Sequence, residues 1–152
     1  MSPERLTCAT ESELSELTSL CLRSKAYWGY DAAFMSACED VLQVTRDDLA
    51  QPCAVVRSGD TFAGYVRVNL ADDEPELSKL FVCPNHMGHG HGTALIRWAK
   101  QQARENGCTY LMVESDPDAA PFYKHHGAIV VGEAPSEAIP NRFLPLLKLP
   151  TD

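Results

Sequence analysis

The segment Leu80–Ile96 brings together residues that could hold an anion and elements that could position it. An apolar run ends at Pro84, and Gly88, Gly90 and Gly92 then recur at every second position. Glycine allows positive φ angles and keeps side chains away from a ligand. The helix expected after these glycines begins with unpaired N–H groups and the positive end of its dipole. A strand, a glycine loop and a helix N-terminus in this order predict a site for a phosphate or pyrophosphate.

Three phosphate-binding patterns can be compared with this segment. A Walker A loop places a lysine before its Ser/Thr, whereas Thr93 follows Gly92 directly. A dinucleotide-binding loop has its third glycine one residue later, but Glu114 supplies an acidic residue near the expected place, so this interpretation stays open as the weaker one. The third pattern, Val-x-Pro with a short turn and Gly-x-Gly-x-Gly/Ala-x-x-Leu, is filled by Val82, Pro84, Gly88, Gly90, Gly92 and Leu95. Here the segment resembles the acetyl-CoA loop of the GCN5-related N-acetyltransferase (GNAT) superfamily.

A second segment, Asp116–Ala128, resembles the GNAT signature Asn-x-x-Ala-x-x-Phe-Tyr-x-x-x-Gly-Phe. The matching residues are Ala119, Phe122, Tyr123 and Gly127. Asp116 stands where Asn is usual, and in the first segment Met87 stands where Gln or Arg is usual. The Asp116 carboxylate can cap a short helix by accepting from backbone N–H groups. It cannot donate a hydrogen bond to a cofactor as Asn would.

The resemblance implies an α/β (α+β) fold whose mixed, mostly antiparallel sheet of six to seven strands is splayed at the acetyl-CoA site, with about four helices on both faces. It implies one N-acetyltransferase domain over residues 1–152, which moves the acetyl group of acetyl-CoA to a primary amine of a small molecule or an amino terminus by direct attack in a ternary complex. The residues that it places at the cofactor are Leu80, Phe81, Val82, Met87, Gly88, His89, Gly90, His91, Gly92, Thr93, Asp116 and Phe122. The alternative is a non-catalytic acyl-CoA-binding sensor or interaction module, for which Met87 and Asp116 leave room.

Acetyl transfer to an amine needs a base for the amine proton, donors for the oxyanion and an acid for the departing thiolate. The resemblance makes Tyr123 the acid, because it occupies the tyrosine of the Phe-Tyr signature; a packing tyrosine bonded to backbone is its alternative role. Glu76 is the expected base, six residues before Val82. Even spacing predicts one strand face for Glu76, Ser78, Leu80 and Val82, where apolar neighbours raise the pKa of a carboxyl. A solvated strand end, or a water chain instead of a fixed base, is the alternative.

Two further groups of residues suggest ligands. The resemblance places the turn containing Trp28 and Tyr30 over the acceptor pocket, where aromatic rings can hold an amine by cation–π contact; a hydrophobic staple between two helices is equally compatible. His86, His89 and His91 raise the question of zinc. Because zinc sites usually add a cysteine or carboxylate in a rigid frame and glycines separate these histidines, we expect no metal.

Composition describes an ordinary globular domain. The 152 residues can bury a sizeable core, and 45% are hydrophobic and 22% charged. The net charge of −8 disfavours nucleic-acid and membrane partners and is compatible with a cationic amine. Six cysteines without a C-x-x-C pair predict reduced, buried thiols. Without a recognisable signal peptide or a long apolar run, we expect a cytoplasmic protein.

The helices and strands that position these residues are predicted from hydrophobic periodicity and from residues typical of turns and helix ends. We expect strands at Arg5–Ala9, Cys53–Arg57, Thr61–Leu70, Glu76–Val82 and Cys108–Val113 and at about 128–133 and 142–149. We expect helices after a Thr10–Glu13 capping box, through Phe34, Cys38, Val41 and Leu42, from the glycine loop to Gly107, and near 118–126. The apolar tail Phe143–Leu149 either completes its own sheet or joins that of a second copy, so a homodimer stays open.

Overall fold

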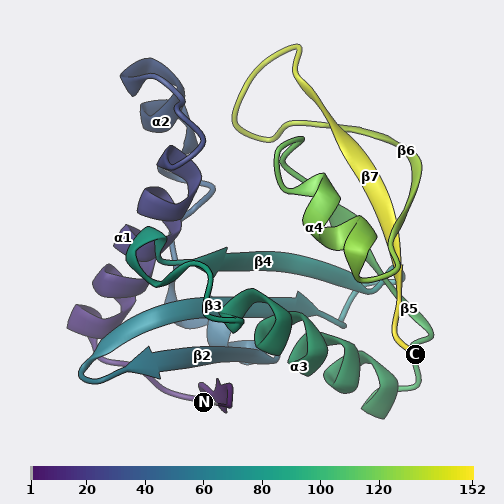
Figure 1. Ribbon diagram of the computed structural model, residues 1–152, viewed down its shortest axis with the longest axis horizontal. Coiled ribbons are helices and arrows are strands. Elements are labelled where there is room, and N and C mark those ends of the chain that lie inside the picture. The colour runs from purple at the N-terminus through teal and green to yellow at the C-terminus, as the bar shows by residue number, and fades with distance from the viewer. Residues whose placement is uncertain (1) are drawn as a thin grey trace.

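The computed structural model describes residues 2–152 and leaves Met1 outside the description. Its seven strands form one sheet in the order β1-β2-β3-β4-β5-β7-β6, with helices on both faces (Figure 1). The strands are β1 (Glu4–Arg5), β2 (Cys53–Ser58), β3 (Thr61–Asn69), β4 (Glu76–Val82), β5 (Tyr110–Glu114), β6 (Ile129–Pro135) and β7 (Phe143–Pro150). The helices are α1 (Glu11–Ala26), α2 (Ala32–Cys38), α3 (His91–Glu105) and α4 (Ala120–His125), with 3-10 turns at Arg46–Ala50 and Pro84–His86. This architecture confirms the expected fold class.

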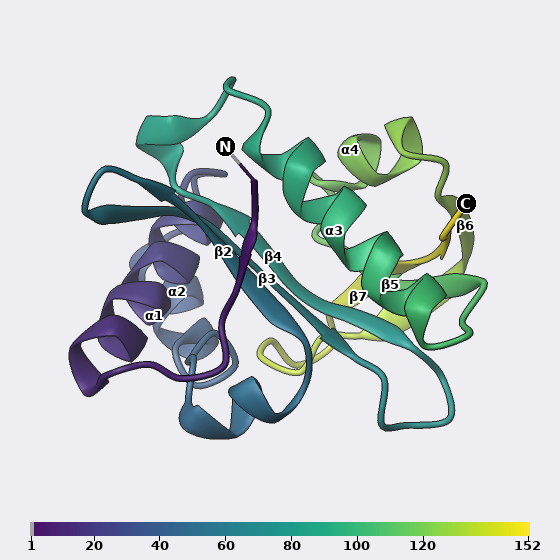
Figure 2. The same cartoon turned by 90° about the horizontal axis from the view of Figure 1, so that it is seen from below.

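Two apolar cores lie on opposite faces of the sheet. Figure 2 shows α1 and α2 on one side of β2–β4 and α3 on the other. Leu17 and Leu20 of α1 pack in the same fully buried cluster as Tyr65 of β3. On the other face, Leu95 and Ile96 of α3 are fully buried in a second cluster. Burying each such side chain contributes about 1.5–3 kcal/mol, so these two cores hold β2–β4 between their helices.

The sheet separates between β4 and β5. These neighbouring strands are parallel, and the register pairs them only at Glu76 and Met112. Pro75 O also accepts from the Met112 N–H at 2.8 Å. Along its other edge β5 pairs with β7 over its whole length, from Tyr110↔Pro150 to Glu114↔Leu146. The two strands therefore diverge toward the carboxyl end of β4, and their facing backbone groups are left without ladder partners.

A bulge in β4 makes the predicted strand face wrong. Arg67 pairs with Lys79 and Val68 with Leu77, so the register skips Ser78. The Ser78 hydroxyl donates to Arg67 O at 3.1 Å and anchors the extra residue. A one-residue bulge reverses the alternation of side chains. Leu77, not Glu76, consequently packs in the same apolar cluster as Leu80 and Val82. Glu76 points to the opposite face, the one that α1 and α2 cover.

The local signals at the helix ends are confirmed. The Thr10 hydroxyl accepts from Glu13 N–H at 3.1 Å, and the Glu13 carboxylate accepts from Thr10 N–H at 2.9 Å, forming the capping box of α1. After α3, Gly107 adopts φ 79°, as expected at a left-handed helix end. Asn106 and Gly107 close the helix with bonds to Gln102 O, Ala103 O and Arg104 O.

Two predicted boundaries are wrong. The first strand ends at Arg5 and not at Ala9, because its partner β2 starts after Pro52, which has no N–H to extend the ladder. The second helix ends at Cys38, and Leu42 N–H to Cys38 O is a single helical bond within the following turn. That turn carries Leu42 into the core on the α1 side and leaves Val41 exposed.

The C-terminal tail completes its own sheet. Strand β7 lies between β5 and β6, pairing with both in antiparallel register. This leaves β6 as an edge strand that exposes Ile129, Val130 and Val131. The six cysteines, all within residues 2–152, are free; four are buried as predicted, but Cys8 is exposed and Cys108 half-buried. Within the described residues, none of the helices combines the length and apolar character needed to cross a membrane.

Candidate active site

A cleft of about 790 Å³ opens where β4 and β5 separate. Its walls come from β4, the glycine loop, the start of α3, the end of β5, α4 and residues 135–144. The structure brings the following predicted residues to this cleft: Trp28, Glu76, Leu80, Phe81, Val82, Met87, Gly88, Gly90, His91, Gly92, Thr93, Asp116, Phe122 and Tyr123. Two predicted residues, His89 and Tyr30, do not line it. Glu76 and Tyr123, which are far apart in the sequence, are thereby brought to one cleft by the fold.

The glycine loop presents a row of free backbone donors. Gly88 and Gly90 adopt φ angles of 82° and 80°, and the first intrahelical bond of α3 runs from Ala94 N–H to Gly90 O at 3.0 Å. Within residues 2–152, no backbone acceptor takes the N–H groups of residues 88–93. Consecutive free N–H groups at a helix N-terminus form an anion-binding concavity. The loop therefore fits a phosphate or pyrophosphate group through its backbone.

Gly92 serves a different purpose from the one predicted. Its φ angle is not positive, unlike those of Gly88 and Gly90. A Cβ at this position would lie 3.2 and 3.3 Å from two ring carbons of Phe122. Gly92 thus allows the first turn of α3 to approach α4 closely.

The His91 imidazole adds little positive charge to the loop. Burial, followed by the neighbouring His86 and His89, lowers the pKa of His91 below its usual value of 6.5. A lowered pKa keeps this imidazole neutral at neutral pH. The ring centroids of His86 and His89 lie 6.3 and 6.1 Å from that of His91. Among residues 2–152, no group of three or more His, Cys, Asp or Glu side chains gathers around a possible metal position.

The free edge of β4 offers two further donors. Cys83 donates its N–H to Ala63 O across the β3 ladder at 2.8 Å. Because backbone groups alternate along a strand, the N–H groups of Val82 and Leu80 point away from β3 and into the gap beside β5. Donors in such a gap can stabilise negative charge on a carbonyl oxygen.

Tyr123 lies in the wall of the cleft with a protonated hydroxyl. Its side chain on α4 is 6% exposed, and its ring packs edge-on against Phe122 with centroids 5.3 Å apart. Burial raises the pKa of the phenol above its usual value of 10.0. Among the side-chain hydrogen bonds of residues 2–152, none involves the Tyr123 hydroxyl, in contrast to Tyr30 and Tyr110. The phenol is therefore free to donate its proton to a ligand.

Glu76 lies half-buried at the start of β4, where its carboxyl has an elevated pKa. The main cause is burial, and the negative charges of Glu114 and Glu137 add to it. Arg67 opposes the shift, but its Nε donates to Asp48 O at 2.9 Å and lies 3.5 Å from Asp48 Oδ1. A carboxyl whose pKa is raised toward neutrality is suited to accept a proton from a bound amine.

A polar cluster around Asp116 is the part of the site that the sequence did not reveal. Asp116 Oδ2 accepts from Lys25 Nζ and from the Tyr30 hydroxyl, both at 2.6 Å, and Arg142 Nη2 lies 3.9 Å away. Arg142 also donates to the Tyr30 hydroxyl at 2.9 Å. Burial opposes ionisation of Asp116, but the hydrogen bonds from Lys25 and Tyr30 outweigh it, so the pKa falls below 3.8. The signal in the sequence was the aspartate in the Asn position of the signature, because a carboxylate that becomes buried needs a positive partner.

This cluster corrects the predictions for Asp116 and Tyr30 and leaves Trp28 at the cleft, where it was expected. Asp116 Oδ1 accepts from Asp118 N–H at 2.9 Å, so its side chain closes a turn before α4; the residue at the N-cap is Ala119, without a side-chain bond. Tyr30 stacks on Phe34 with ring centroids 3.9 Å apart and uses its hydroxyl within the cluster, which keeps it out of the cleft. Trp28 lies at the cleft and is 41% exposed.

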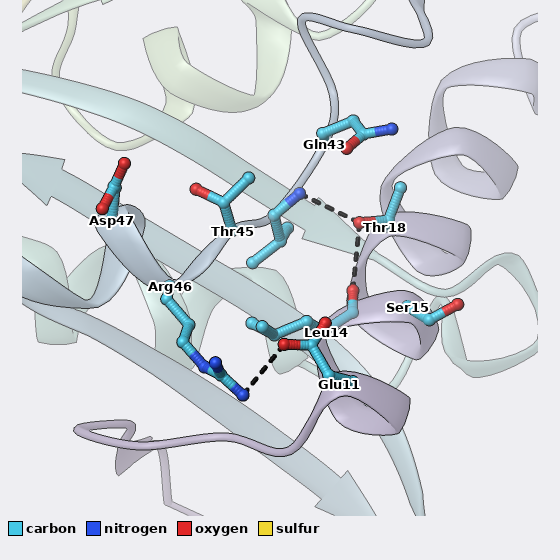
Figure 3. Close-up of a pocket in the computed structure, with 9 residues that line it drawn as sticks. Glu11, Leu14, Ser15, Thr18, Gln43, Thr45, Arg46 and Asp47 are labelled. Atoms are coloured by element: carbon cyan, nitrogen blue, oxygen red, sulfur yellow. Dashed lines mark hydrogen bonds and ion pairs between the residues drawn. The ribbon is translucent and has the colours of Figure 1, made fainter.

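A second groove, of about 510 Å³, runs between α1 and residues 43–47 (Figure 3). The Thr18 hydroxyl in this groove accepts from Val44 N–H at 2.9 Å and donates to Leu14 O at 3.0 Å, so it is engaged in both directions. The ion pair of Glu11 and Arg46, at 2.9 Å, is largely exposed. The groove has no buried polar group free for a ligand, which leaves the cleft at β4 and β5 as the candidate active site.

Comparison with known proteins agrees with this geometry. The sequence model of the acetyltransferase (GNAT) family matches residues 15–128. The uncharacterized N-acetyltransferase YjcF of Bacillus subtilis (strain 168) is 28% identical over 79 residues, which span 52% of this chain and 56% of that relative. The GCN5-related N-acetyltransferase from Rhodopseudomonas palustris matches with a TM-score of 0.75 at 17% identity, over 99% of this chain and 96% of that one.

The PaiA N-acetyltransferase from Thermoplasma acidophilum, solved in complex with coenzyme A, matches with a TM-score of 0.75 at 13% identity over 99% of both chains. At such low identities these two structures support the fold alone. The family model carries more weight, because it covers well over half of the sequence. The chain belongs to the acetyltransferase (GNAT) family.

Proposed function

We propose that this protein is an acetyl-CoA-dependent N-acetyltransferase that acts on a primary amine of a small molecule or an amino terminus. The observation that carries the proposal is the coincidence of three features in one cleft. These features are the free N–H groups of residues 88–93, the inward N–H groups of Leu80 and Val82, and the buried phenol of Tyr123. The coenzyme A bound to the related fold from Thermoplasma acidophilum supports the choice of cofactor.

The cofactor-binding residues divide by chemistry. The N–H groups of residues 88–93 hold the pyrophosphate, and the positive end of the α3 dipole adds to their attraction. Leu80, Phe81 and Val82 present the free edge of β4 to the rest of the cofactor. Met87 adds apolar surface where many relatives carry a polar side chain, so affinity here depends on the backbone donors. Bound acetyl-CoA supplies an acetyl thioester, which is activated toward nucleophiles.

The protein's own groups then move two protons. Glu76 takes a proton from the amine, directly or through a water molecule, as the new N–C bond replaces the C–S bond of the thioester. The N–H groups of Leu80 and Val82 donate to the negative charge that develops on the carbonyl oxygen. Tyr123 gives its hydroxyl proton to the departing sulfur, for which its raised pKa keeps it protonated.

Binding and turnover test this proposal separately. Calorimetric titration with acetyl-CoA, with desulfo-CoA and NAD as controls, is expected to show saturable micromolar binding of the CoA compounds only. Release of free thiol from acetyl-CoA is then measured with a panel of primary amines. Binding of NAD instead would overturn the cofactor assignment. Binding of acetyl-CoA with no thiol release for any amine would favour a sensor or interaction module over an enzyme.

A further inference from the structure

The positive and the negative side chains that line the cleft differ in whether they have ion-pair partners. All four Lys and Arg side chains among the described lining residues already have carboxylate partners within 4 Å. Lys25 and Arg142 share Asp116, at 2.6 and 3.9 Å. Arg67 and Lys79 share Asp48, at 3.5 and 3.6 Å. The cleft therefore has no spare cation with which to bind an anionic acceptor.

The carboxylates of the cleft are in the opposite situation. Glu76, Glu114 and Glu137 line it, and none of the three forms an ion pair with another group in residues 2–152. They come from the start of β4, the end of β5 and the segment between β6 and β7. Their mutual repulsion, after burial, contributes to the raised pKa values of Glu76 and Glu114. Bringing uncompensated like charges together raises the free energy of the folded protein, and a bound cation lowers it again.

A second feature, of different chemistry, also indicates a ligand in this space. The hydroxyl of Tyr123 lies in the wall of the same cleft on a side chain that is 6% exposed, and it has no hydrogen-bond partner among residues 2–152. The hydroxyl is therefore available for a hydrogen bond to a ligand in the cleft. A bound metal does not explain the carboxylates, since among the described residues no three of them converge on one position.

We propose that the acceptor is a diamine or oligoamine, in which Glu114 and Glu137 bind a distal ammonium while Glu76 attends to the amine that is acetylated. This inference rests on the proposed acetyltransferase function and specifies its substrate class. A distal cation satisfies two carboxylates that the fold leaves unpaired, and the free carboxylates also attract a polycation toward the cleft. A neutral tail satisfies neither carboxylate, and an anionic tail is repelled.

Three amines built on the same four-carbon chain distinguish a cationic, a neutral and an anionic tail in assays of the wild-type protein. Putrescine carries a distal ammonium, butylamine a distal methyl group and γ-aminobutyrate a distal carboxylate. Initial rates of thiol release are expected to give kcat/KM about tenfold higher for putrescine than for butylamine, and the lowest value for γ-aminobutyrate. The advantage of putrescine is expected to shrink as salt rises, because the attraction is partly screened.

Two double variants test whether Glu114 and Glu137 cause the preference for putrescine. In Glu114→Gln/Glu137→Gln, the ratio of kcat/KM for putrescine to kcat/KM for butylamine is expected to fall about tenfold, toward one. Glu105→Gln/Glu133→Gln makes the same change in net charge at exposed positions outside the cleft and is expected to keep the wild-type ratio. Urea unfolding of each variant verifies that it is folded.

The possible failures are distinguishable. Equal kcat/KM for putrescine and butylamine in the wild type, or an unchanged ratio in the cleft variant, would overturn the diamine inference and leave the acetyltransferase proposal intact. A preference for γ-aminobutyrate would overturn it in the same way. Absence of thiol release with all three amines and with the wider panel would overturn the proposed function, and the inference with it.

Discussion

At the residue scale, burial gives the two expected proton carriers opposite tasks. Desolvation raises the pKa of both Tyr123 and Glu76, because it penalises the charged form of each. For the phenol this keeps a proton available at neutral pH. For the carboxyl it makes the anion a stronger base than an ordinary glutamate. One physical cause thus prepares an acid on α4 and a base on β4, on two walls of the same cleft.

Replacing Tyr123 by Phe tests the acid. The change removes one oxygen and leaves the ring packed against Phe122, so folding and acetyl-CoA binding are expected to persist. We expect kcat for acetyl transfer to fall about a hundredfold, within the usual range for loss of a general acid. Thiol release measures the rate and calorimetry the affinity. Tyr110→Phe is the control, because the Tyr110 hydroxyl bonds to Glu74 outside the cleft. Equal rates for wild type and Tyr123→Phe would remove Tyr123 from the mechanism.

The pH dependence of kcat/KM tests the base. Glu76 acts only as a carboxylate, and a raised pKa means that it holds its proton to a higher pH. Activity is therefore expected to be lost on acidification with a midpoint above 4.5, the ordinary value. Glu114→Gln removes one of the charges that raise this pKa, so the midpoint is expected to move down. In Glu76→Gln, this loss of activity on acidification is expected to disappear from the pH profile. A wild-type midpoint at or below 4.5, unmoved by Glu114→Gln, would favour a water chain as the base.

At the element scale, features encoded by neighbouring residues were predictable and features set by a partner strand were not. The capping box of α1 and the glycine after α3 depend on residues a few positions apart, and both were found from the sequence. The bulge at Ser78 depends on how β4 aligns with Arg67 and Val68 of β3. Nothing in the alternation of β4 itself reveals it, so Glu76 was expected on the wrong face of the strand.

The two ends of α3 offer a matched test of the glycine loop. Gly90 and Gly107 have φ angles of 80° and 79°, and a Cβ would meet no atom within 4 Å at either position. Alanine at either site is expected to destabilise the protein by about 1 kcal/mol, because L residues disfavour this conformation. Only Gly90→Ala disturbs the row of donors at residues 88–93, so only this variant is expected to weaken acetyl-CoA binding, by about tenfold. Urea unfolding and calorimetry measure the two effects; equal affinities in both variants would place the phosphate elsewhere.

At the scale of the whole molecule, the Asp116 cluster links the two halves of the splayed sheet. Along the sheet, β4 and β5 are paired only at Glu76 and Met112. Across the cleft, Asp116 after β5 binds Lys25 at the end of α1 and Tyr30 before α2. These residues are 91 and 86 positions away from it in the chain. Such separations explain why the cluster could not be predicted, and why Tyr30 was assigned to the substrate instead.

Asp116→Asn tests whether this cluster holds the halves together. The asparagine side chain is close in shape to the aspartate but cannot form an ion pair with Lys25. Because the Asp116 side chain is only 9% exposed, losing its charged hydrogen bonds is expected to lower the free energy of unfolding by about 2 kcal/mol at pH 7. The folded pKa of Asp116 lies below its unfolded value of 3.8. Its contribution is therefore complete above that value and is lost as pH falls through the folded pKa. The difference in unfolding free energy between wild type and variant is expected to be constant from pH 7 to about pH 5 and to shrink below about pH 4.

Urea unfolding at a series of pH values measures this difference, and Asp73→Asn, an exposed aspartate away from the cleft, is the control for loss of one charge. If Asp116→Asn is as stable as the wild type at pH 7, the cluster does not carry the link between the halves. The single β4–β5 pairing and the contacts of α3 with both strands must then do so. If the difference persists unchanged below the folded pKa, the stabilisation comes from the shape of the turn at Asp118 and not from the charge. The expected convergence at low pH therefore distinguishes an electrostatic link across the cleft from a purely local turn.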